Sequence, residues 1–193
     1  MKSKLLKFLG ITLIAAAIFA CLALSASAVD LSQLSYSTND DGTITITDCD
    51  KNAEGELVIP EKIGGRAVTV IGSSAFEDCI YITKVTIPST VTSIGYSAFE
   101  HCSALEAINI PDSVTSLMFD VFADCTSLKS VVFPETFTDL GEQGYSCDIF
   151  RNCTSLESVT LPSSLKAIGG TVFYGCTSLQ SVTLPEGLAY IGD

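Results

Sequence analysis

The side chain best suited to catalysis in this sequence is its single histidine, His101. A hydrolase triad needs a basic side chain that an acid holds in place, and His101 is the one histidine that could supply that base. Segments of similar sequence carry Asp78, Asp124, Asn152 and Gly175 at the place that His101 occupies. We therefore interpret His101 as a variable polar turn residue, and the sequence predicts no catalytic residue.

Two acidic patterns are also compatible with chemistry. Glu106 and Glu157 resemble the carboxylate pair of a glycosidase, but they lie two repeats apart and are interpreted as solvated charge. Residues 48–52, Asp-Cys-Asp-Lys-Asn, imitate the start of an EF-hand loop. Ala53 stands where that loop needs glycine and Ile59 where it needs glutamate, so the segment is interpreted as a polar loop. No metal and no cofactor is expected.

The first 28 residues have the three parts of a secretory signal peptide. Three lysines precede an apolar run over residues 8–24, and Ala-Ser-Ala, ending at Ala28, forms a cleavage site. The mature protein would begin at Val29 and be secreted or displayed at the cell surface. Two alternatives stay open: an uncleaved membrane anchor formed by the apolar run, and a lipoprotein modified at Cys21.

Charge restricts the partners of the mature chain. Removing residues 1–28 leaves 22 acidic and seven basic residues, a formal net charge of −15. Nucleic acids and anionic membrane lipids are bound by clustered Lys and Arg, so neither is expected as a partner. The remaining 165 residues suit a single domain.

Five cysteines recur at matching places with spacings of 23, 23, 28 and 23 residues: Cys79, Cys102, Cys125, Cys153 and Cys176. Cysteines in an exported chain ordinarily indicate disulfides, but one repeated position predicts a buried ladder of free thiols. Cys49 and Cys147 fall outside this ladder, and Cys147 with Cys153 is the one local pair to test for a disulfide. Without a C-x-x-C motif, the sequence does not support a zinc or thioredoxin-like site.

Two more residue types share this spacing. A phenylalanine recurs at 76, 99, 122, 150 and 173, and a proline that ends a strand-like apolar run recurs at 88, 111, 134, 162 and 185. Each unit reads as a short strand ending at proline, a return of apolar residues to the core, and a helical or 3₁₀ turn that directs Phe and Cys inward. Extra residues around 142–146 and at 64–68 are expected to form surface bulges. One unit cannot bury its apolar face alone, so neighbouring units must stack.

These motifs resemble the BspA-type leucine-rich repeats of bacterial surface antigens. The resemblance rests on the phrase Cys-Thr-Ser-Leu-x-Ser-Val-x-Leu/Phe-Pro at Cys125, Cys153 and Cys176, and on Ile-Gly-x-x-Ala-Phe at Ile71 and Ile94. It implies a β-rich leucine-rich-repeat solenoid with short parallel strands on one face and short turns on the other. Residues 29–56 would form an N-terminal capping module, and residues 57–193 about six coils, the last one incomplete.

The outward positions of the strands are the candidate binding face. If Leu156, Val159 and Leu161 point inward, the register places small polar and charged residues outside. This candidate binding face comprises Lys84, Thr86, Glu106, Asn109, Lys129, Val132, Glu157, Ser158, Thr160, Gln180 and Thr183.

Two classes of function follow from the resemblance. The first is a non-enzymatic, adhesin-like binding protein whose strand face engages an extracellular protein or glycan, including host matrix proteins. The alternative is a structural or spacer scaffold within a larger surface protein, and a secreted hydrolase is a remote third. The uncapped last coil also suggests self-association through its open strand edge.

Overall fold

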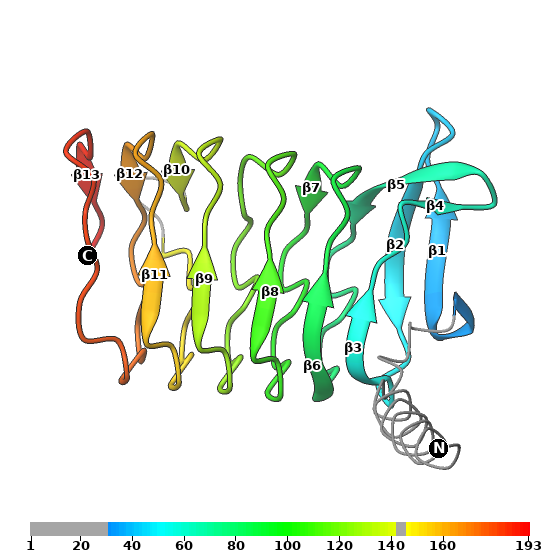
Figure 1. Ribbon diagram of the computed structural model, residues 1–193, viewed down its shortest axis with the longest axis horizontal. Helices are drawn as coiled ribbons and strands as arrows, with labels where there is room; N and C mark the ends of the chain where they lie inside the picture. Colours follow the sequence, from blue (N-terminus) through cyan, green and yellow to red (C-terminus); the bar gives the residue numbers. More distant parts are fainter. Residues whose placement is uncertain (1–30, 142–145) are drawn as a thin grey trace, which may run out of the picture.

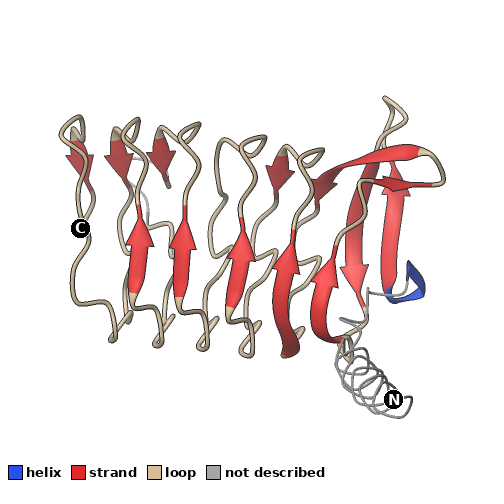
Figure 2. Ribbon diagram, in the orientation of Figure 1, coloured by secondary structure: helices blue, strands red, loops and turns tan. Residues whose placement is uncertain are grey.

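The computed structural model describes residues 31–141 and 146–193. The signal peptide predicted for residues 1–28 lies outside these described residues, as does most of the insertion predicted at 142–146. Among the described residues, no helix has both the length and the apolar character needed to cross a membrane. The one helical element drawn is a 3₁₀ turn, Leu31–Gln33, and strands and loops make up the rest (Figure 2).

The described chain forms a β-solenoid whose coils stack side by side (Figure 1). One row of parallel strands forms what we call the strand face, with its members one repeat apart in sequence. Register partners confirm this spacing, since Lys84 pairs with Ala107 and Ser130 with Ser158. The row consists of β3 (Glu54–Val58), β6 (Tyr81–Thr86), β8 (Ala107–Asn109), β9 (Ser130–Val132) and β11 (Ser158–Thr160).

One of the predicted strands is absent. Residues 182–184, which follow the same sequence pattern as β11, form no strand. A hollow of about 390 Å³, lined by Thr160, Thr183 and Pro185 among others, lies between β11 and this segment. The expectation of a sixth strand in this row was wrong, because strands in a ladder lie only about 4.8 Å apart and leave no such space.

A second row of strands follows the apolar Ile-Gly part of each unit. Most of its members are short, and they pair in parallel within two groups, as in Ile71 with Ile94 and Ile168 with Ile191, while the coil between β7 and β10 forms no strand here. The row contains β5 (Arg66–Ile71), β7 (Ser93–Ile94), β10 (Asp139–Leu140), β12 (Ala167–Ile168) and β13 (Tyr190–Ile191).

The N-terminal segment adds a hairpin to this second row. Strands β1 (Leu34–Thr38) and β2 (Ile44–Cys49) pair antiparallel, and β2 then pairs in parallel with β5. The turn between them needs a positive φ at Gly42, where φ is 83°. Ile44 and Ile46 are buried, so the hairpin extends the core of the solenoid.

The predicted bulge at residues 64–68 is only partly a bulge. Gly64 and Gly65 form an exposed turn between β4 (Lys62–Ile63) and β5, which pair antiparallel. Val68 in contrast is fully buried within β5, where its register partner is Ile44 of β2. The expectation was wrong for Val68 because the sequence gives no sign that the hairpin would offer β5 a strand to pair with.

The core is organised by the repeated phenylalanines. Phe76, Phe99, Phe122 and Phe150 are fully buried, and their rings stack in sequence with centroids 5.0, 5.6 and 5.5 Å apart. Phe173 continues the stack 5.8 Å from Phe150, although it is only partly buried. Stacked rings at these separations stabilise the fold by about 0.5–1.5 kcal/mol per pair beyond the burial of their surface.

The side of the solenoid that carries Phe and Cys consists of tight turns, and we call it the turn face. Each coil places two residues there in the left-handed region of backbone conformation, which Gly, Asn, Asp and His tolerate better than other residues. Their φ angles lie between 47° and 75°. One column is Ser74, Ser97, Asp120, Asp148 and Thr171, and the other is Asp78, His101, Asp124, Asn152 and Gly175.

The predicted cysteine ladder is present on the inner side of this face. The thiols of Cys102, Cys125, Cys153 and Cys176 each donate to a phenylalanine carbonyl of the preceding coil at 3.1 Å. No disulfide joins Cys147 to Cys153. Cys49 is also buried, but its thiol donates to the carbonyl of Asp50 at 3.7 Å and not to a phenylalanine carbonyl of a preceding coil, so it stays outside this ladder.

Candidate functional site

The strand face exposes the residues that the sequence places there. Ten of the eleven residues of the candidate binding face are exposed, and Thr86 is half-buried. The inward set behaves as expected, with Leu156 and Val159 buried and Leu161 partly buried against the core. Gln180 and Thr183 lie on loop rather than strand. The outward orientation is therefore a structural fact, whereas binding by these residues stays a prediction.

Charges on the strand face are paired across neighbouring coils. The ammonium of Lys84 lies 3.4 Å from a carboxylate oxygen of Glu56, and that of Lys129 lies 2.6 Å from Glu106. The hydrogen bond and the negative charge of Glu106 raise the pKa of Lys129. Because Lys129 contacts Glu106 directly, Glu106 and Glu157 do not form an unobstructed carboxylate pair of the kind a glycosidase uses.

Asn109 has a structural role in addition to its exposure. Its side-chain oxygen accepts from the backbone N–H of Ile87 at 2.8 Å, and its side-chain nitrogen donates to the Ile87 carbonyl at 3.0 Å. The amide group thus satisfies both backbone groups at the end of β6. A ligand that needed this amide would have to replace two hydrogen bonds.

Two shallow hollows lie on the strand face. One, of about 330 Å³, covers β6 and β8 and is lined by Lys84, Thr86 and Asn109 among others. The other is the hollow between β11 and the last coil, where Glu135 accepts two hydrogen bonds from Ser163, at 2.7 and 3.0 Å. Five residues of the candidate binding face line one hollow or the other.

The structure adds two outward residues that the sequence analysis omitted. Val58 is the register partner of Thr86, and Glu56 that of Lys84. Val58 is 46% exposed, and together with Val132, which is 63% exposed, it adds apolar side chains to a row that is otherwise polar. Extending the same strand register back to residues 54–58 would have predicted that Glu56 and Val58 point outward.

The turn face carries a separate cluster of charged residues around His101. The ring Nδ1 lies 3.1 Å from Asp78, and Nε2 lies 3.8 Å from both Glu100 and Asp124. Arg151 holds the last two carboxylates, at 3.2 and 2.9 Å. In the part of the chain that the structure describes, the imidazole forms its hydrogen bond and ion pairs with carboxylates, and no hydroxyl or thiol is placed for a triad to activate.

Burial controls the chemistry of the thiols. Loss of solvent raises the pKa of Cys102, Cys125 and Cys153 above the ordinary cysteine value, and that of Cys176 to about 11. A cysteine nucleophile needs the thiolate, which these environments disfavour. The ladder therefore acts as packing, as the sequence analysis expected.

Comparison with known families gives a match over most of the chain. The model described as "BspA type Leucine rich repeat region" matches residues 56–147 and 145–193, in six copies. A search of curated proteins found no match. The resemblance inferred from the repeated motifs is thereby confirmed.

Solved structures show the same architecture. A leucine-rich repeat protein of T. pallidum is 28% identical with a TM-score of 0.67, and the match covers 86% of each chain. A leucine-rich cell surface protein of Faecalibacterium prausnitzii A2-165 is 33% identical with a TM-score of 0.69, over 77% of this chain and 37% of that one. A leucine-rich repeat protein of Bacteroides ovatus is 30% identical with a TM-score of 0.61, over 83% of this chain and 54% of that one. The chain therefore spans about half or less of two of these relatives.

Proposed function

Because the chain belongs to the BspA-type leucine-rich repeat family, we propose that it is an exported, non-enzymatic binding protein. Its strand face would engage an extracellular protein or glycan in an adhesin-like manner. The similarity to a cell surface protein of F. prausnitzii supports a location outside the cell. An N-terminus at Val29, measured by mass spectrometry on the protein recovered from its host, would support cleavage of the signal peptide.

The observation that carries the proposal is that exposed side chains and shallow hollows occur together on the strand face. Outward residues lie in register within β3–β6–β8 and within β9–β11, and one described hollow lies at each of these groups. Solenoids commonly bind partners across such extended surfaces. The face contains no Trp and its Lys residues are paired, so each copy would bind with modest affinity.

The test is binding of residues 29–193 to immobilised host matrix proteins, bacterial cells and glycans, at low and physiological salt. Thr160→Lys adds a bulky charge to the strand face beside a hollow and should reduce a saturable signal about tenfold or more. Thr138→Lys is the matched control, because Thr138 is exposed beside β10 in the second row. Equal loss in both variants, or no loss in either, would reject the strand face as the binding surface.

A structural scaffold is the second candidate function. Leucine-rich repeats make up most of the sequence, and two of the similar proteins are much longer than this chain. Absence of any saturable signal across the panel would favour this candidate over binding. Hydrolase activity of the pure protein above that of a heat-treated control would contradict both.

Self-association is a further proposal for the partner. The last coil leaves Leu184 and Ile191 exposed, at 47% and 55%, and in the described chain β13 is paired only with β12. A second copy would bury these side chains and extend the ladder. Sedimentation should show association that depends on protein concentration and is weakened by Ile191→Glu, and a strictly monomeric profile would reject it.

A further inference from the structure

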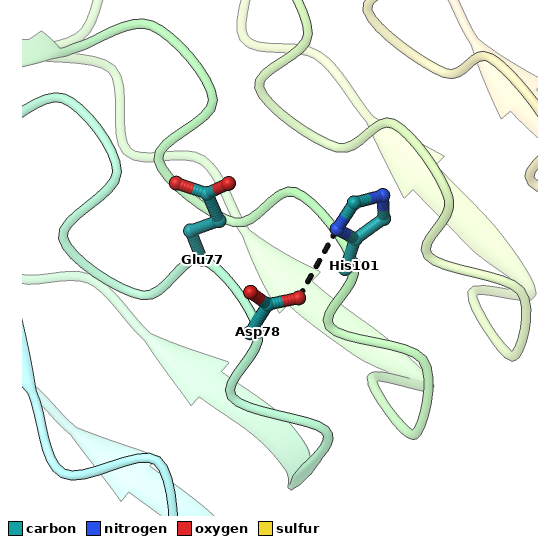
Figure 3. Close-up of side chains that lie close together, drawn as sticks. All are labelled: Glu77, Asp78 and His101. Atoms are coloured by element: carbon teal, nitrogen blue, oxygen red, sulfur yellow. Dashed lines mark hydrogen bonds and ion pairs between the residues drawn. The ribbon is translucent and has the colours of Figure 1, made fainter.

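Three donor groups from two neighbouring coils converge on the turn face. Glu77 and Asp78 come from one turn and His101 from the equivalent turn of the next coil (Figure 3). Their candidate ligand atoms all lie within 4.8 Å of one another. The sequence gave no sign of this group, because Asp78 and His101 are 23 residues apart and each repeat supplies only part of it.

The backbone fixes where two of these side chains start. Asp78 and His101 both have a φ of 60°, and each donates its N–H to a carbonyl of the following coil, at 3.0 and 2.9 Å. The Asp78 carboxylate oxygen and the His101 Nδ1 are consequently held 3.1 Å apart. Two ligands of one zinc ion, each about 2.0–2.1 Å from the metal in tetrahedral geometry, have a similar separation.

Carboxylates also face the imidazole from both sides. A neutral ring has one N–H and one lone pair. If Nε2 carries the hydrogen, the Nδ1 lone pair lies 3.1 Å from an oxygen of Asp78, and a cation bound at Nδ1 would relieve the repulsion between them. If Nδ1 carries it, Nδ1 donates to Asp78, and Nε2 lies 3.8 Å from Glu100 and Asp124, beyond hydrogen-bond distance.

Arg151 decides which side is open to such a cation. Its guanidinium contacts Glu100 and Asp124 on the Nε2 side, where it supplies positive charge. Within the described ranges, the ion pairs place no lysine or arginine against Glu77 or Asp78.

We propose that Glu77, Asp78 and His101 form a site for a transition-metal dication of the Zn²⁺ class, with Nδ1 as the histidine ligand. One imidazole and two carboxylates suit such an ion better than Ca²⁺, which needs six to eight oxygens. Water would complete the coordination. The bound ion would link two successive coils on the outer side of the turn face, whereas the phenylalanine stack lies on the inner side of that face.

The test uses the protein freed of any affinity tag and titrated with ZnCl₂ by calorimetry, with stoichiometry from native mass spectrometry. His101→Asn removes the histidine ligand but keeps a residue that accepts the left-handed backbone conformation. Asn152 already adopts this conformation at the equivalent position of another coil. The Kd should rise about tenfold or more. Glu186→Gln removes an exposed charge elsewhere and should leave the Kd unchanged.

Three results would overturn the proposal. One is no binding to the parent protein at 100-fold molar excess of Zn²⁺, and another is equal binding by the parent and His101→Asn, which would point to the cysteines instead. The third comes from ¹⁵N NMR of the ring nitrogens, which is unambiguous because the chain has one histidine. Zinc should shift Nδ1 and leave Nε2 protonated; a shift at Nε2 would assign the ion to the Glu100 side.

Discussion

The strand face and the turn face are made by the same repeat, yet the backbone restricts them very differently. On the strand face the chain is extended, so the backbone accepts any residue that suits a strand, as the change from Thr86 to Asn109 along one row illustrates. On the turn face the left-handed conformation of Asp78 and its equivalents restricts residue type. The backbone conformation therefore restricts which polar residues occur on the turn face, whereas it leaves the exposed polar residues of the strand face available to a ligand.

This comparison predicts unequal consequences for stability. Phe99→Ala on the turn face empties the middle of the phenylalanine stack and should reduce the free energy of unfolding by about 3–5 kcal/mol. Val132→Ala on the strand face removes an exposed side chain and should change it by less than about 0.5 kcal/mol. Urea unfolding followed by circular dichroism measures both, and similar losses would break the comparison.

Alkaline pH should act through the turn face. The pKa of Cys176 is raised by burial to about 11 from 9.0, so above pH 9 the unfolded chain releases a thiol proton that the folded chain retains. The contribution of this thiol to the free energy of unfolding is therefore fully present below pH 9 and is lost as the pH rises toward 11. Cys176→Ala should make the decline in stability between pH 8 and pH 11 smaller in urea titrations. An unchanged pH profile would contradict the burial of this thiol.

Asn109 tests whether one strand-face residue has a structural role. Asn109→Ala removes both hydrogen bonds to the backbone of Ile87 and should reduce the free energy of unfolding by about 1–2 kcal/mol. Thr160→Ala, at an exposed position of the same row of outward residues, should change it by less than about 0.5 kcal/mol. If thermal unfolding gives the same midpoint for both variants, the contacts of Asn109 do not contribute to stability.

The smallest effect concerns backbone strain. Thr171 has a φ of 59°, which is unfavourable for a β-branched residue, so Thr171→Asn should stabilise the protein by about 0.5–1 kcal/mol. Thr177→Asn is the control, since Thr177 is exposed and its φ is not positive. A higher melting temperature for the first variant alone would sharpen the contrast between the faces; equal values would remove it.

Most of the fold could be predicted because the inward positions repeat. The spacing shared by Phe99, Cys102 and Pro111 with their equivalents fixed the number of coils, the strand register and the thiol ladder. Two predictions failed. Val68 is buried because a hairpin outside the repeat pairs with β5, and residues 182–184 form no strand although they match the repeat pattern.

The sequence by itself determined which side chains face the core and which face solvent, because burial follows a period that can be read along the chain. Only the tertiary structure decided which exposed groups meet. The pairing of Lys129 with Glu106, the hydrogen bonds of Asn109 and the convergence of Glu77 with His101 all join residues of different coils. Stacking brings such residues within a few ångströms, and no local pattern encodes that approach.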